Sequence, residues 1–211
     1  MALRIFLARH GDTFAPGQPV LWAGSSNDLP LAPRGLEQAR TLGRYLRTGG
    51  IRPERVFCGP LERTRHFAAL AIEALGLPLR ATVDPRLNEL DYGGWSGLTN
   101  QQVIEQFGRA ELEQWNARSI WPVSAGWGSS ESAIRAEVRA FATSLVVRTE
   151  EDPVLVVSSN GRLRYFLSLI PGEFERRQES HDFKIGTGNL SLLTFERGVF
   201  TLDFWNRTPE P

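Results

Sequence analysis

The sequence combines a histidine with two arginines that can bind a tetrahedral anion. His10 stands between Arg9 and Gly11, directly after an apolar run at residues 2–8. Arg63 falls in the first turn of a helical pattern that follows a second apolar run. Two planar guanidinium groups near one another suit the oxygens of an oxyanion such as phosphate. Because glycine has no side chain, Gly11 lets a bound group approach the backbone closely.

A carboxylic acid adds the possibility of proton transfer. Glu89 lies in the segment "LNELDYGGWSG", beside Leu90 and Tyr92. Apolar surroundings favour the protonated form of a carboxyl group, so Glu89 is a candidate general acid. Each of these residues also has an ordinary interpretation, as a packed histidine, a salt-bridged arginine or a solvated carboxylate. The combination favours a reaction centre, because all of them follow predicted strands.

The elements that must position these residues alternate between strands and helices. We expect strands at 2–8, 55–59, 80–87 and 153–158, helices at 31–50, 60–75, 100–118, 131–149 and 161–170, and a hairpin over 189–205 that turns at Arg197-Gly198. This order predicts a three-layer α/β/α sandwich with a mostly parallel sheet and an antiparallel edge. In such a sheet, ligands bind at the carboxyl ends of the strands. We expect one domain over residues 1–211, with residues 100–130 forming a cap over the site.

Composition excludes several other functions. Lys and Arg total 24 and Asp and Glu also total 24, which argues against binding to nucleic acid or to a membrane surface. The single cysteine excludes an intrachain disulfide, and with three histidines it leaves little for a metal site. We therefore expect no metal and no cofactor. No targeting signal or membrane-length apolar run is recognisable, so a cytoplasmic location is expected. The exposed edge hairpin makes an oligomer possible.

Five segments appear in an order that resembles a known family. They are "LARHGDT", "DLPLAPRGLEQAR", "GPLERTR", "LNELDYGGWSG" and "VLVVSSNGRLR". Together they resemble the histidine phosphatase superfamily, which contains cofactor-dependent phosphoglycerate mutase and its phosphatase relatives. The resemblance runs from residue 3 to about residue 205 and implies a phosphoglycerate mutase-like fold.

The resemblance also implies roles for individual residues. His10 would be the nucleophile that forms a phosphohistidine, and Arg9 and Arg63 would hold the phosphoryl oxygens. Glu89 would protonate the leaving oxygen and then help to activate water. Thr13 closes the first motif and joins the predicted substrate-binding residues. Arginines can neutralise the phosphoryl oxygens, so the resemblance implies no metal.

One histidine of the family pattern has no counterpart in this sequence. The fourth strand of the family usually ends in Ser-His-Gly-Gly, whereas this chain has Ser158-Ser159-Asn160-Gly161. An ungapped alignment puts Ser159 at the place of the histidine, and a shift of one residue puts Asn160 there. Ser159, Asn160 and the following backbone N–H groups can still bind an anion, but they carry no positive charge. Loss of such a donor typically slows a reaction by about 10²–10³-fold.

Other residues offer weaker candidates for the site. His66 falls on the second helix, where we expect an ordinary helix residue. His181 and Lys184 belong to a segment that could fold over the pocket. Trp115, Trp121 and Trp127 lie in the predicted cap. They either stack on a substrate or, as we expect for each one, fill the core beneath the cap. Pro16 stands where the family often has Asn, so the resemblance does not identify the substrate.

These observations favour a metal-independent phosphomonoester hydrolase that acts on a small phosphorylated substrate through His10. Its turnover is expected to be slow if nothing replaces the second histidine. An alternative is a binding or regulatory protein that keeps a degenerate phosphate site. A phosphomutase ranks last, because the chain is short for that subgroup.

Overall fold

The fold is built on one six-stranded mixed sheet. The computed structural model describes residues 2–147 and 153–210. The strands are β1 (Leu3–Arg9), β2 (Arg55–Cys58), β3 (Ala81–Val83), β4 (Val154–Ser158), β5 (Leu190–Glu196) and β6 (Val199–Arg207). Their spatial order is β3-β2-β4-β1-β5-β6, with β1 to β4 parallel and the β5–β6 hairpin antiparallel at one edge. This confirms the predicted sheet and the hairpin turn at Arg197-Gly198.

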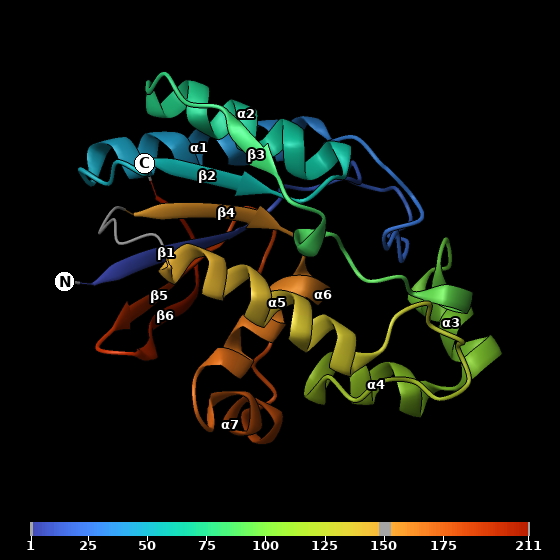
Figure 1. Cartoon of the computed structure of the whole chain (residues 1–211). Helices are drawn as coiled ribbons and strands as arrows, with labels where there is room; N and C mark the ends of the chain where they lie inside the picture. The colour runs from blue at the N-terminus through green and yellow to red at the C-terminus, as the bar shows by residue number, and fades with distance from the viewer. Residues whose placement is uncertain (1, 148–152, 211) are drawn as a thin grey trace.

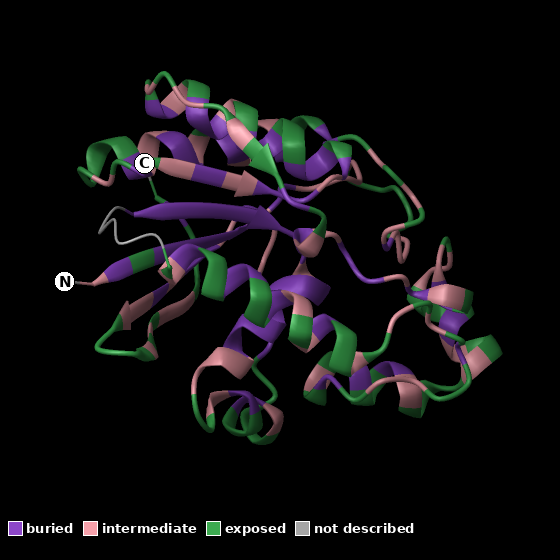
Figure 2. Cartoon of the chain, viewed as in Figure 1, coloured by how far each residue is buried: buried purple, intermediate pink, exposed green. Residues whose placement is uncertain are grey.

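Helices cover both faces of the sheet, as Figure 1 shows. One face carries α1 (Pro33–Thr48) and α2 (Glu62–Leu75), and the other carries α5 (Glu131–Val146), α6 (Asn160–Leu163) and α7 (Glu173–Ser180). All five residues of β4 are buried (Figure 2), which explains why this strand reads as an unbroken apolar run rather than an alternating one. The predicted three-layer α/β/α sandwich is confirmed.

Two further helices lie beyond the carboxyl ends of β2 and β4 (Figure 1). They are α3 (Asn100–Phe107) and α4 (Arg109–Arg118). The sequence predicted a single helix over 100–118, but the chain breaks at Gly108, whose φ of 93° is incompatible with a helix. The break turns α4 back beside α3 at this end of the sheet.

The structure corrects several other predicted boundaries. The strand predicted over 80–87 stops at Val83, because Pro85 starts a 3₁₀ turn over Pro85–Leu87. The helix predicted over 161–170 is the short α6 followed by a 3₁₀ helix over Arg164–Leu169. The helix predicted over 131–149 ends at Val146, and positions 148–149 lie outside the described residues. Helix α7 was not predicted, since it buries only Phe174 and Arg177 and so lacks an apolar stripe.

The register of the sheet positions the reactive residues. Arg9 at the end of β1 pairs with Ser158 at the end of β4. The amide of His10 donates a 3.0 Å hydrogen bond to the carbonyl of Ser158. The two chain segments that follow these strands therefore start side by side at one edge. Within the described part of the chain, no helix has the length and hydropathy needed to span a membrane.

Candidate active site

A cavity of about 690 Å³ opens at the carboxyl ends of β1 and β4. It brings together most of the residues that the sequence singled out: Arg9, His10, Thr13, Arg63, Glu89 and Asn160. They come from segments up to 151 positions apart, between residues 9 and 160. The parallel arrangement of the strands therefore creates one site from separate motifs.

His10 is held as a neutral base. Its ring Nδ1 lies 2.7 Å from the carbonyl oxygen of Gly11, and since a carbonyl only accepts, Nδ1 carries the proton and Nε2 keeps its lone pair. The side chain is buried, at 6% exposure. Burial, followed by the positive charges of Arg9 and Arg63, lowers the pKa of His10 well below its usual value of 6.5. A neutral imidazole with a free Nε2 is competent for nucleophilic attack.

The guanidinium groups of Arg9 and Arg63 are fixed by carbonyl groups. Nη1 of Arg9 donates to the carbonyl of Ile185 at 2.7 Å. Nη1 and Nη2 of Arg63 donate to the carbonyls of Asn27 and Gly24, at 2.9 Å and 2.7 Å. No carboxylate in the described part of the chain forms an ion pair with either arginine. Their positive charge is thus oriented but not neutralised, which suits an anionic ligand.

Glu89 connects the two sides of the cavity. Its Oε1 accepts a 2.9 Å hydrogen bond from its neighbouring amide at Leu90, and its Oε2 accepts a longer bond of 3.4 Å from the amide of Gly161. Glu89 is 9% exposed and lines the cavity. Its charge raises the pKa of Arg9 and Arg63, in opposition to burial, so it lies within electrostatic reach of both.

The turn after β4 differs from the predicted anion-binding loop. Ser159 is fully buried, its hydroxyl has no partner among the described residues, and it does not line the cavity. Asn160 does line the cavity, and its Oδ1 accepts a 2.9 Å hydrogen bond from the amide of Ile185. The amide of Gly161 faces Glu89 and is therefore not free to bind an anion. The structure favours Asn160 over Ser159 as a residue that meets a ligand.

Tyr92 and Arg164 are cavity residues that the sequence did not assign to the site. Tyr92 follows Glu89 by three positions, and burial raises its pKa well above 10, so its hydroxyl stays protonated as a hydrogen-bond donor. Arg164 donates to Trp115 O at 3.1 Å and Ser119 Oγ at 2.9 Å, and its guanidinium lies 4.0 Å from the Trp115 ring centroid. An arginine inside the apolar run "LRYFLSL" was the signal for a buried charge that must have partners.

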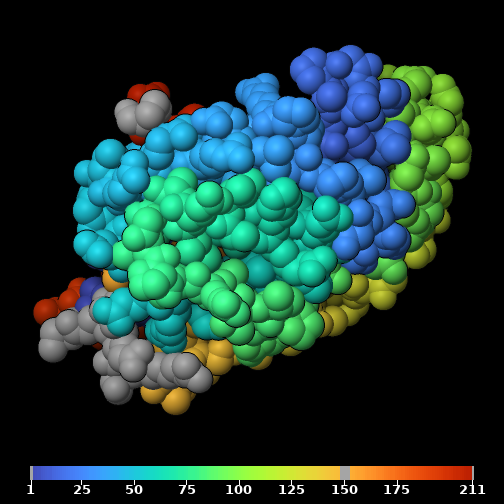
Figure 3. Space-filling view, turned by 90° about the horizontal axis from the view of Figure 1, so that it is seen from above, coloured from blue at the N-terminus to red at the C-terminus, as the bar shows by residue number. Residues whose placement is uncertain are grey.

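The apolar wall of the cavity comes from the loop after β1. Phe14, Leu21 and Trp22 line it. The loop contacts the chain at the start of α3, where Leu21 forms a β-bridge with Thr99 and Trp22 Nε1 donates to Asn100 Oδ1 at 2.8 Å. In Figure 3 the dark blue loop after β1 and the yellow-green segment of α3 and α4 lie against each other at one end of the molecule.

The tryptophans of the predicted cap pack against one another. The ring centroids of Trp115 and Trp127 are 4.6 Å apart, and those of Trp121 and Trp127 are 4.8 Å apart. None of the three lines the cavity, and Trp115 is 1% exposed. They belong to the core beneath α3 and α4, as expected for each one singly, and Trp22 supplies the indole ring at the cavity.

The other two histidines lie away from the cavity. His66 is exposed on α2, and His181 is exposed after α7, where its Nε2 accepts a 3.2 Å hydrogen bond from Arg118. Lys184, by contrast, lines the cavity. His10 is thus the one histidine on the cavity wall, and the described residues contain no group of three or more His, Cys, Asp or Glu side chains placed to hold a metal ion.

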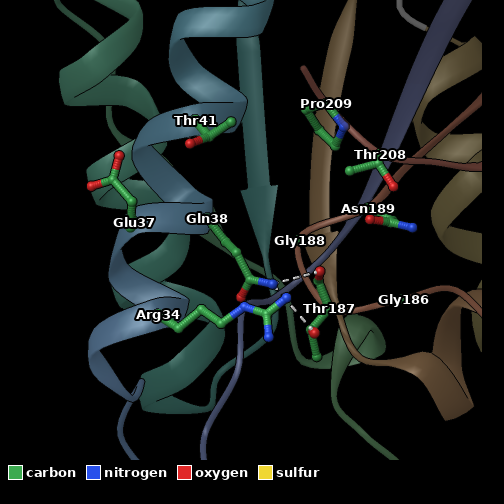
Figure 4. A pocket seen from close by; sticks show the side chains of 10 residues that line it. All are labelled: Arg34, Glu37, Gln38, Thr41, Gly186, Thr187, Gly188, Asn189, Thr208 and Pro209. Carbon is green, nitrogen blue, oxygen red and sulfur yellow. Dashed lines mark hydrogen bonds between the residues drawn. The ribbon is translucent and has the colours of Figure 1, made fainter. Parts of the chain in front are cut away.

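A second cavity of about 470 Å³ lies between α1 and residues 186–189 (Figure 4). Gln38 Nε2 donates to the carbonyl of Thr187 at 2.9 Å, and Gln38 Oε1 accepts from the amide of Asp12 at 2.8 Å. The amide of Gly188 in turn donates to the carbonyls of Arg9 and His10. These contacts support the reactive loop on the side away from the active-site cavity.

Comparison with known proteins identifies related chains. A sequence model of the histidine phosphatase superfamily (branch 1) matches residues 5–208. A 2,3-bisphosphoglycerate-dependent phosphoglycerate mutase of Methylobacterium sp. (strain 4-46) is 30% identical over 169 residues, covering 80% of each chain. An adenosylcobalamin/alpha-ribazole phosphatase of Salmonella typhimurium is 30% identical over 173 residues, covering 79% of this chain and 78% of that protein.

Solved structures share the whole fold. The alpha-ribazole phosphatase of Shigella flexneri matches with a TM-score of 0.76 and 26% identity over 97% of this chain and 96% of that one. A mycobacterial glucosyl-3-phosphoglycerate phosphatase, solved with VO3, matches with a TM-score of 0.80 and 25% identity over 97% and 98% of the two chains.

Proposed function

Because the chain belongs to branch 1 of the histidine phosphatase superfamily, we propose that it hydrolyses a small phosphomonoester through a phosphohistidine on His10. Its family and the phosphatases among its relatives make it an enzyme of the histidine phosphatase type. The observation that carries the proposal is the neutral His10, which presents a free Nε2 beside two guanidinium groups that form no ion pair with the described carboxylates.

The proposed reaction has two steps. Nε2 of His10 attacks phosphorus while the bond from phosphorus to the leaving oxygen breaks, and Glu89 donates a proton to that oxygen. A water molecule then attacks the phosphohistidine, the P–N bond breaks, and Glu89 takes the proton of the water. Arg9 and Arg63 stabilise the charge on the phosphoryl oxygens in both steps. We propose that residues 100–130 cap the site from the side of the leaving group.

The direct test is to trap the intermediate. Enzyme mixed with ³²P-labelled p-nitrophenyl phosphate is quenched in conditions that preserve phosphohistidine, and p-nitrophenol release is followed in parallel. Wild type and the His66→Ala control are expected to show both label and turnover. His10→Ala is expected to lose both, by several orders of magnitude, while keeping its fold. Undiminished turnover in His10→Ala would disprove the nucleophile assignment.

Two other functions give different results in the same assay. A binding protein would bind phosphate but show neither label nor turnover in wild type. A mutase is the second candidate function, because several relatives carry that name. It would convert 3-phosphoglycerate only after priming with 2,3-bisphosphoglycerate, and would transfer the phosphoryl group faster than it loses it to water.

A further inference from the structure

The chain contains a single lysine, and it lies at the active-site cavity. Lys184 is the one lysine among 24 basic residues, and all the others are arginines. It lines the same cavity as His10, Arg9 and Arg63. In the ion pairs among the described residues the basic partner is an arginine.

The backbone around Lys184 is fixed by active-site residues. The amide of Ile185 donates to Oδ1 of Asn160 at 2.9 Å, and the carbonyl of Ile185 accepts from Nη1 of Arg9 at 2.7 Å. On the other side, Phe183 is fully buried with its ring centroid 4.8 Å from that of Phe174. Both neighbours point into the protein, and Lys184 is the exposed residue between them.

Lys184 differs from the other cations of the cavity in having no partner. Arg9 and Arg63 bond to carbonyls, Arg164 bonds to Trp115 and Ser119, and Arg34 pairs with Asp12 at 3.4 Å. In the parts of the chain that the structure describes, the ammonium of Lys184 has neither a hydrogen bond nor an ion pair. Its flexible four-carbon stem leaves that charge free to move, whereas each guanidinium is held in one orientation.

We propose that Lys184 binds the phosphoryl group directly and supplies the mobile positive charge of this active site. Its backbone lies one peptide from the carbonyl that orients Arg9, so its ammonium can approach the same phosphoryl oxygens. Asn160, at the start of α6, cannot provide a cation, but it accepts a hydrogen bond from the amide of Ile185, the residue after Lys184. The proposal rests on the function proposed above, since it concerns the same site.

The test measures phosphate affinity, which needs no turnover. Inorganic phosphate and orthovanadate are titrated into wild type, Lys184→Met, Lys184→Arg and Arg80→Met. Arg80 is a matched control because it is exposed and precedes β3, at the end of the sheet opposite the cavity. Loss of a charge-assisted hydrogen bond is expected to weaken phosphate binding about ten- to a hundredfold in Lys184→Met. Lys184→Arg should recover most of this loss, and Arg80→Met should match wild type.

The single lysine permits a second readout. Pyridoxal 5′-phosphate condenses with primary amines, and borohydride reduces the resulting imine to a stable adduct that peptide mass spectrometry can locate. We expect the adduct on Lys184, with protection by inorganic phosphate, while any adduct on the N-terminal amine is not protected. Unchanged phosphate affinity in Lys184→Met, or labelling of Lys184 that phosphate does not reduce, would overturn the proposal. Wild type that binds phosphate but shows no turnover would instead disprove the hydrolase function alone.

Discussion

The reactivity of His10 depends on its being uncharged in a strongly positive site. Burial makes the largest contribution to its lowered pKa, followed by Arg9 and then Arg63, and the hydrogen bond to Gly11 opposes them only weakly. The ring therefore keeps its lone pair at a pH where an exposed histidine is half protonated.

This environment predicts an anomalous titration. NMR of the protein with ¹³C-labelled histidine should show one imidazole that stays neutral at pH 6, and that signal should vanish in His10→Ala. Arg63→Met should raise the pKa of His10, because it removes one of the charges that lower it, whereas Arg80→Met should leave it unchanged. A His10 signal that titrates at 6.5 or above in wild type would contradict the neutral-nucleophile argument.

The loss of activity in Glu89→Gln should depend on the leaving group of the substrate. A general acid contributes most when the leaving oxygen is strongly basic, so Glu89→Gln is expected to slow an alkyl phosphate by about 10²-fold or more. p-Nitrophenyl phosphate, whose leaving group needs little protonation, should lose less than about tenfold. The measurement is kcat/KM for a series of aryl and alkyl phosphates. Equal losses across the series would assign Glu89 a role other than proton donation.

At this scale the sequence predicted which segments meet at the cavity better than which way each side chain points. Arg9 ends β1 and His10 follows it, while Arg63 and Glu89 belong to the segments after β2 and β3, and the parallel topology brings these segments to one edge of the sheet. The choice between Ser159 and Asn160 depended on side-chain direction after β4, which the sequence does not specify. Arg164 and Tyr92 were missed because a position a few residues after a motif does not reveal whether the side chain faces the cavity or the core.

At the scale of elements, the loop of His10 is held by unusually close contact with α1. A Cβ atom on Gly11 would lie 2.5 Å from the carbonyl oxygen of Gly35, and a Cβ on Gly35 would collide with the carbonyl oxygen of Asp12. The amide of Ala32 also donates to Asp12 O at 2.8 Å. The start of α1 therefore fixes the backbone of the reactive loop.

Gly35→Ala is expected to separate α1 from this loop. Overpacking of this kind costs about 1–3 kcal/mol of unfolding free energy, and the displacement of His10 should lower kcat more than the stability loss alone would. Urea unfolding and p-nitrophenyl phosphate turnover measure the two effects. Gly49→Ala, at the far end of the same helix, is the control and should change both only slightly. Full activity in Gly35→Ala would show that the contact does not position the nucleophile.

Elements with a clear hydrophobic period were predicted from the sequence, and those without one were not. The stripe of α1 and the apolar run of β4 fix their types unambiguously. Helix α7 carries five charged residues in "EFERRQES" and is stabilised by ion pairs such as that of Arg177 with Glu173, which produce no period. The division of 100–118 at Gly108 depends on a backbone conformation that glycine permits but does not require.

At the scale of the whole molecule, the cavity combines the carboxyl edge of the sheet with two segments outside the sheet, the loop after β1 and the start of α3. The end of β1 supplies Arg9 and His10 and α2 supplies Arg63, while the loop after β1 and the start of α3 meet through Trp22 and Asn100 to close one side. The mostly parallel sheet with its antiparallel edge was predicted from the alternation of strands and helices. The pairing of the loop with α3 was not, because it depends on contacts between two irregular segments.

The charge of this assembly leads to a prediction about metal ions. The phosphoryl group is expected to meet the guanidinium groups of Arg9 and Arg63, so its negative charge is neutralised by the protein itself. Dialysis against EDTA should therefore leave p-nitrophenyl phosphate turnover unchanged, and added Mg²⁺ should not raise it. Arg63→Met treated in the same way tests whether a metal ion can substitute for a lost guanidinium. Strong inhibition of wild type by EDTA, reversed by a divalent cation, would mean that the arginines do not suffice and that the phosphoryl charge is shared with a metal.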